Sequence, residues 1–121
     1  MTGEELLFFD AAPASLALYE MLKERLLALY PQTRIKVSKT QISFSDKYIY
    51  ACVSLPRRKQ DAGGLVFSLG LPCETTNAAL MAVSQPYPGR YTHHFLLKNA
   101  NDFSSSLQQY TALAHSFCLS K

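Results

Sequence analysis

The sequence predicts an α+β fold, a two-layer sandwich in which a mostly antiparallel sheet of five or six strands carries an N-terminal and a C-terminal helix on one face. Amphipathic helical patterns lie near both ends of the chain, and β-rich segments with short connections lie between them. Short connections favour antiparallel pairing, because parallel strands need long crossovers. Each amphipathic helix must bury its apolar side, and the apolar face of the sheet is the available surface.

The first long helix is predicted over residues 14–30. Pro13 suits the first helical turn, where its missing N–H costs nothing, and Pro31 ends the helix. The apolar side chains of this segment share one arc of a helical wheel: Leu18, Tyr19, Leu22, Leu26, Leu29 and Tyr30. We expect that arc to face the sheet.

Strands are predicted through the middle of the chain. Residues 34–38 and 41–45 both alternate polar and apolar side chains, at odd apolar positions in the first and even ones in the second. A turn or a bulge near Lys39 and Thr40 must therefore reset the alternation. The other expected elements are strands at 48–55, 65–71 and 91–98, a flexible basic loop at 56–64 and a short helix around 78–81.

The closing helix is predicted to follow an N-cap at Asp102. Its expected apolar face consists of Phe103, Leu107, Tyr110, Ala114 and Phe117. Its expected outward face consists of Ser104, Gln108, Thr111 and His115. Together with the first helix, it would cover one side of the sheet and leave the other side open.

Composition indicates one globular domain over residues 1–121. A hydrophobic content of 48% with 17% charged residues excludes a disordered chain, and this length supports a single core. The first residues carry acids where a signal peptide needs Lys or Arg, and no apolar stretch approaches the roughly 20 residues of a membrane helix. The cysteines are odd in number and lack C-x-x-C spacing. A cytoplasmic protein with reduced thiols and no membrane association is expected.

Charge is segregated along the chain. Nine basic side chains lie between positions 34 and 98: Arg34, Lys36, Lys39, Lys47, Arg57, Arg58, Lys59, Arg90 and Lys98. Only three acids lie in the same stretch, so its net charge is +6, whereas the two ends together sum to −3. Because this stretch is also the strand-rich one, its side chains can add their fields on one face and attract an anionic partner.

Several segments together resemble a small bacterial domain family of unknown function, sometimes labelled a predicted transport protein. They are the helix 18–30 with its Pro31, the stretch 34–44 with Lys39-Thr40 before Ile42-Ser43-Phe44, and residues 48–55, 64–71 and 91–117. The pattern is also distantly similar to YdhG-type iron-chaperone-like and YjbR-type α+β domains. The resemblance covers about residues 8–118 and implies the same fold, with no established activity or catalytic residue.

Candidate ligand-binding residues lie mainly on the predicted strands. They are Arg34, Lys36, Lys39, Tyr48, Tyr50, Arg90, Tyr91, His93 and His94. Tyrosines beside cations can stack bases while the cations neutralise phosphates, as in single-strand binders. The alternative is an ordinary solvated sheet face with half-buried tyrosines. A lysine at a bulge can be aimed into a groove, so Lys39 is either a ligand-gripping cation or part of a register device.

Two further clusters have alternative explanations. The run 57–59 could grip a phosphate or an acidic protein surface, or it is a charged, mobile hairpin tip that favours solubility. His93 and His94 are adjacent on a strand and point to opposite faces, so they cannot both bind one metal. No metal site, cofactor or catalytic residue is therefore expected, although one histidine could act as a general acid or base.

These observations predict a non-enzymatic binding module that uses the open face of the sheet and a groove near Lys39, Arg90 and the histidine pair. The expected ligand is anionic: nucleic acid, a small anion or an acidic protein surface. The main alternative is a protein-interaction or homo-oligomerisation module, in which an edge strand or helix face docks a second copy or a partner. An enzyme that uses one histidine of the pair is the third alternative.

Overall fold

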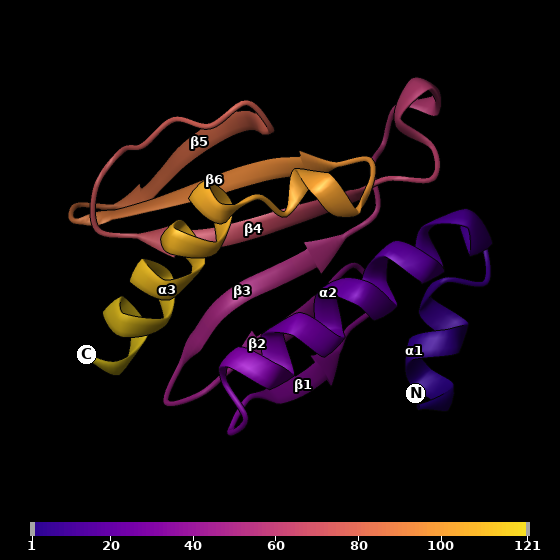
Figure 1. Ribbon diagram of the computed structural model, residues 1–121, viewed down its shortest axis with the longest axis horizontal. Coiled ribbons are helices and arrows are strands. Elements are labelled where there is room, and N and C mark those ends of the chain that lie inside the picture. The colour runs from indigo at the N-terminus through magenta and orange to yellow at the C-terminus, as the bar shows by residue number, and fades with distance from the viewer. Residues whose placement is uncertain (1, 121) are drawn as a thin grey trace.

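The computed structural model describes residues 2–120 and shows an antiparallel six-stranded sheet with helices at both ends of the chain (Figure 1). The helices are α1 (Gly3–Phe8), α2 (Leu16–Leu29) and α3 (Ser105–Leu119). The strands are β1 (Arg34–Val37), β2 (Ile42–Ser45), β3 (Ile49–Ser54), β4 (Leu65–Leu71), β5 (Leu80–Tyr87) and β6 (Arg90–Leu97). Their order in the sheet is β1-β2-β3-β4-β6-β5. The predicted α+β class is confirmed.

Both long helices lie on the same side of the sheet (Figure 1). Helix α3 packs on β3 and β4, and Tyr19 of α2 stacks near Phe44 of β2, with 6.3 Å between ring centroids. Strand β4 is central, and its odd-numbered side chains are fully buried beneath the helices: Leu65, Phe67, Leu69 and Leu71. The hydrophobic core therefore fills the space between one face of the sheet and the two helices.

The expected reset of alternation between the first two strands is a hairpin. The Ser38 N–H donates to the Gln41 carbonyl over 2.8 Å, and Val37 pairs with Ile42. This register brings the odd apolar residues of β1 and the even ones of β2 to the same face. The register shift nearest this hairpin lies between Phe44 and Ser45, where β2 pairs with β3.

The prediction of a short helix around residues 78–81 is wrong, because this segment leads into β5. A two-residue turn, Pro88-Gly89, joins β5 to β6, and Gly89 has φ +85°, which glycine adopts without strain. Pairing with β6 supplies backbone hydrogen bonds that outweigh the weak helical preference of the segment. The six-residue helix α1 was not predicted either.

The buried side of α3 differs from the expected one. Its buried residues are Leu107, Thr111, Ala114 and Cys118, whereas Tyr110 and Phe117 are only half-buried. Thr111 tolerates burial because its hydroxyl donates to the Leu107 carbonyl over 2.8 Å. His115, expected to face outward, lies with Nε2 3.0 Å from Asp46 Oδ2 and stacks on Tyr30. These contacts tie α3 to the β2–β3 turn.

Helix α1 is anchored to α2 by a buried carboxylate. Glu5 is 1% exposed, accepts hydrogen bonds from the Tyr19 hydroxyl and the Thr2 backbone, and pairs with Lys23 Nζ at 2.9 Å. Burial by itself raises the pKa of Glu5, but these partners together outweigh it and lower the pKa to about 2. No helix among residues 2–120 has the length and apolar character needed to cross a membrane.

Replacing this carboxylate changes how stability depends on pH. Because the folded-state pKa of Glu5 lies below its ordinary 4.5, its stabilisation is complete above pH 4.5 and is lost as the pH falls towards 2. Glu5→Gln is expected to lower the free energy of unfolding at pH 7 by about 3 kcal/mol and to flatten this acid dependence. Urea unfolding at pH 7 and pH 3 measures both effects.

The matched control is Glu4→Gln, which changes an exposed carboxylate on the same helix. It should alter the free energy of unfolding by less than about 0.5 kcal/mol. Equal losses for the two variants would contradict the role assigned to Glu5.

Candidate functional site

The side of the sheet turned away from α2 and α3 is the open face. Strand register places thirteen residues of five strands on it: Arg34, Lys36, Ser43, Ser45, Cys52, Ser54, Val66, Ser68, Gly70, Arg90, Thr92, His94 and Leu96. Alternation determines this set, since their neighbours along each strand point into the core. The open face therefore combines small polar side chains with three cations.

A row of small polar side chains crosses the centre of the open face. Ser43, Cys52, Ser68 and His94 are successive cross-strand partners on β2, β3, β4 and β6. Ser68 Oγ lies 2.8 Å from His94 Nδ1, and the Cys52 thiol lies 3.9 Å from Ser43 Oγ. Such a row presents hydroxyl, thiol and imidazole groups to a ligand above the sheet.

The Arg90 side chain lies over β4 because of a glycine. A Cβ built on Gly70 would be 2.6 Å from Arg90 Nη2 and 2.8 Å from Cζ, so the guanidinium occupies the space that a side chain would fill. Arg90 is half-buried and takes part in none of the ion pairs among residues 2–120. The structure thus holds a positive charge against the sheet, and no carboxylate of residues 2–120 forms an ion pair with it.

The charge of Arg90 lowers the pKa of the Cys52 thiol, but it is not a cause of the shift at His94. Burial raises the pKa of the Cys52 thiol, and the hydrogen bond with Ser43 and the charge of Arg90 partly oppose that rise. Burial, and then the neighbouring His93, lower the pKa of His94. Both groups are therefore neutral at pH 7, and neither cancels nor adds to the charge of Arg90.

Carboxylates are missing from the sheet itself. The six strands contain no Asp or Glu, whereas Arg34, Lys36 and Arg90 all lie on the open face. Arg34 donates from Nη2 to the Asp46 carbonyl over 2.7 Å, and Lys36 is exposed. The strand cations therefore act on this side of the sheet without an opposing charge from the strands.

The tyrosines do not lie where the sequence placed them. Tyr50 is buried on the helix side, with its hydroxyl 2.8 Å from Thr33 Oγ1, and burial is the main cause that raises its pKa to about 12. Tyr91 pairs with buried Leu71 and so also points to the helix side. Tyr48 lies before the start of β3, so it does not share a strand face with Tyr50. The register also shifts at this point, where β2 pairs with β3.

His93 and His94 point to opposite sides of β6, as expected. His93 is buried on the helix side, where Nε2 accepts the Thr75 N–H over 2.9 Å and Nδ1 lies 3.2 Å from the Tyr91 carbonyl. An accepting Nε2 places the proton on Nδ1, so both ring nitrogens are satisfied in the neutral form. His93 is thus a packed core residue, and only His94 remains a candidate for binding.

Lys39 does not join Arg90 in one groove. It lies at the tip of the β1–β2 hairpin and lines a hollow of about 380 Å³ with Glu4, Leu7 and Phe8. Three strands, β2, β3 and β4, separate β1 from β6 in the sheet. The prediction of one groove shared by Lys39, Arg90 and the histidine pair is therefore wrong.

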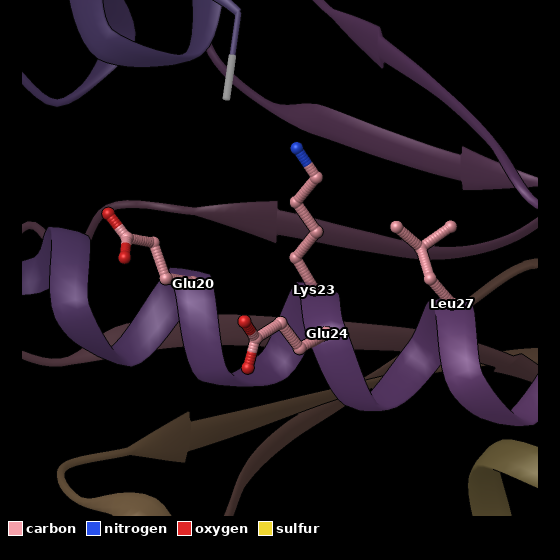
Figure 2. A pocket seen from close by; sticks show the side chains of 4 residues that line it. All are labelled: Glu20, Lys23, Glu24 and Leu27. Carbon is pink, nitrogen blue, oxygen red and sulfur yellow. The ribbon is translucent and has the colours of Figure 1, made fainter.

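Another hollow lies on the outer side of α2 (Figure 2). Its volume is about 420 Å³, and Glu20, Lys23, Glu24 and Leu27 line it. Figure 2 shows Lys23 extending away from the helix, and its Nζ pairs with Glu5 of α1. This hollow thus belongs to the contact that anchors α1. Among residues 2–120, no group of three His, Cys, Asp or Glu side chains could hold a metal ion.

Sequence reasoning missed several residues of the open face. Tyr87 pairs directly with Arg90 across the β5–β6 hairpin and is 51% exposed, but the sequence analysis assigned no strand to its segment. Ser43, Cys52 and Ser68 lie at polar positions of alternating segments, and that alternation was the signal that identifies them.

The position of Arg90 predicts how fast Cys52 reacts. Arg90→Gln removes a charge that lowers the pKa of Cys52, so that pKa should rise. The thiolate fraction and the rate of iodoacetamide labelling at pH 8 should then fall. Mass spectrometry measures the rate at each cysteine, and exposed Cys73 provides the internal reference.

Arg34→Gln is the matched control, since Arg34 lies on the edge strand at the far side of the same face. It should leave the labelling rate of Cys52 unchanged. An unchanged rate in Arg90→Gln would contradict the position of the guanidinium.

Comparisons with known proteins give one result. No curated protein and no solved structure matches the chain. A family model described as "Domain of unknown function (DUF5655)" matches residues 5–119, nearly the whole chain, which agrees with the expected membership of a family without assigned function. The chain belongs to the DUF5655 family.

Proposed function

We propose that the protein is a small binding module whose open face holds a compact anionic group, a phosphate or a carboxylate, with Arg90 as its anchor. The observation that carries the proposal is the half-buried Arg90 guanidinium, which lies over Gly70 and has no ion-pair partner among residues 2–120. A planar guanidinium offers paired N–H donors that match both of these anions. Binding such a group would neutralise a charge that no acid of residues 2–120 pairs with.

Neighbouring groups support an anion at this position. When His94 Nδ1 accepts from the Ser68 hydroxyl, the imidazole proton lies on Nε2 and remains available as a donor. The Arg90 and His94 side chains leave β6 on the same side, four residues apart, and Gly70 leaves room between the sheet and a ligand. Lys36 and Arg34 on β1 add a longer-range attraction that salt screens.

The placement of the aromatic rings favours a compact anion over a nucleic-acid strand. Single-strand binders stack successive bases on several exposed rings, but Tyr50 and Tyr91 lie on the helix side. Tyr87, opposite Arg90, is the aromatic residue that the strand register adds to this face. One ring beside one guanidinium suits a single planar or charged group better than a chain of nucleotides.

Association through strand β5 is the second candidate function. This edge strand contains no charged residue, and Met81, Val83 and Tyr87 are exposed on it. An uncharged edge offers free backbone groups to another strand. Two register shifts and Pro86 interrupt that edge, and such interruptions oppose pairing, so association ranks below anion binding.

An enzyme ranks third. Ser68 and His94 form a hydroxyl–imidazole pair, but the strands supply no carboxylate to orient the imidazole, and the pKa of Cys52 is raised. The bacterial origin, the cytoplasmic location and the distant likeness to YdhG-type and YjbR-type domains belong to this proposal as expectations from the sequence.

The proposal is tested by titrating the protein with inorganic phosphate and following the backbone amide NMR signals of β3, β4 and β6. Arg90→Gln should weaken binding at least about tenfold, because a lost charge-assisted hydrogen bond costs about 1.5–3 kcal/mol. Charge reversal at Arg34 and Lys36 should weaken it less. Raising the salt concentration from about 50 to about 200 mM should weaken it in every variant that retains binding.

The matched control is a variant with alanine at positions 57–59, which removes three cations from a loop outside the open face. It should leave the signals of β3, β4 and β6 and their phosphate response unchanged. A normal response of these strands in Arg90→Gln would refute the proposal. A single-stranded oligonucleotide that binds the same strands far more tightly than phosphate would replace the compact anion with nucleic acid.

A further inference from the structure

A second cationic surface lies away from the open face, where the β3–β4 loop meets the turn that leads into α2. A pocket of about 440 Å³ opens between these two segments. The turn contributes Ala11, Ala12, Pro13, Ala14 and Ser15. The loop contributes Leu55, Pro56, Arg57, Arg58, Lys59, Ala62 and Gly63. Its volume falls within the range of small-molecule sites in proteins.

The floor of the pocket is held in place by contacts that the charged run does not supply. Ser15 is buried and its hydroxyl donates to the Gly64 carbonyl over 2.7 Å, which joins the loop to the start of α2. A Cβ on Gly64 would lie 2.8 Å from the Leu97 carbonyl oxygen, so this approach requires glycine. Gly63 has φ +88°, and Pro13 and Pro56 restrict the backbone on both sides.

The pocket lining combines an apolar surface with cationic side chains. Besides Arg57, Arg58 and Lys59 and the hydroxyl of Ser15, its side chains are alanine, proline and leucine, and the lining contains no acid. The three cations take part in none of the ion pairs among residues 2–120. The acid nearest to these three cations along the chain is Asp61, which is buried, and its Oδ1 lies 4.0 Å from Lys98 Nζ.

We propose that this pocket binds a small soluble organic anion, with a phosphate or carboxylate head at Arg57, Arg58 and Lys59 and a short apolar body against the alanines and prolines. A loop that only keeps the protein soluble needs no preformed floor beneath its charges. Here the buried Ser15–Gly64 hydrogen bond and the two glycines fix the walls of the pocket. Binding a ligand would therefore cost the protein little conformational entropy. The site shares no residue with the open face and does not depend on the function proposed for it.

The test compares phenyl phosphate with inorganic phosphate on the full chain, followed by the amide NMR signals of residues 11–15 and 55–63. Phenyl phosphate should shift these signals and should bind at least about tenfold more tightly than inorganic phosphate, since one buried ring adds 1.4 kcal/mol or more. Equal affinities for the two probes would refute the apolar part of the site. Shifts confined to β3, β4 and β6 would refute the site altogether.

Variants separate this site from the open face. Alanine at positions 57–59, all exposed, should weaken phenyl phosphate binding in the pocket at least about tenfold and leave the response of β3, β4 and β6 intact. Arg90→Gln should do the reverse. If both variants weaken both responses equally, the pocket is not an independent site.

A neutral substitution tests the cavity without changing charge. Ala62→Phe places a large side chain at an exposed lining position and should block phenyl phosphate, while far-ultraviolet circular dichroism reports an unchanged fold. Unimpeded binding in Ala62→Phe, with the fold retained, would contradict the pocket. Binding to phosphatidylglycerol vesicles through residues 57–59, without binding of phenyl phosphate, would replace the soluble anion with a membrane surface.

Discussion

Four side chains of β4, Leu65, Phe67, Leu69 and Leu71, are the contact on which the rest of the structure depends. All four are fully buried under the helices, and each contributes about 2 kcal/mol by leaving water. Because β4 lies between β3 and β6, its register also decides which side of both neighbours enters the core. The even-numbered side chains of β4 are therefore forced onto the open face, and Ser68 and Gly70 are among them.

Covering one side of a sheet requires that the covering helices stay in position, and polar contacts fix them at the edges. The Glu5 network joins α1 to α2, and the His115–Asp46 pair joins α3 to the β2–β3 turn. Ser15 joins the start of α2 to the loop before β4. The first two contacts use the carboxylates of Glu5 and Asp46, whereas the cations of the open face and of residues 57–59 form no ion pair among residues 2–120. The two proposed anion sites arise from that imbalance.

Alternation made most of the fold predictable from the sequence. It located the strands of the middle stretch and the turn near Lys39, and the helical period located the helix before Pro31, because each depends on neighbours within a few residues. It also placed Arg34 and Lys36 on one face and predicted that His93 and His94 point to opposite faces. It failed for Tyr50, since the register shift between β2 and β3 follows from pairing rather than from local pattern. It failed for β5, whose strand exists because β6 supplies its hydrogen bonds.

Local sequence patterns were sufficient to establish the fold class, the excess of basic residues in the middle stretch and the opposite directions of the two adjacent histidines, because composition and period-two geometry are local properties. Packing in three dimensions sets which cations form no ion pair among residues 2–120 and what surrounds them. The contact of the Arg90 guanidinium with Gly70 brings together residues of two different strands. The pocket beside Arg57 brings together segments about forty positions apart in the chain. Such neighbours are set by strand order and by helix packing, and no local sequence pattern carries that information.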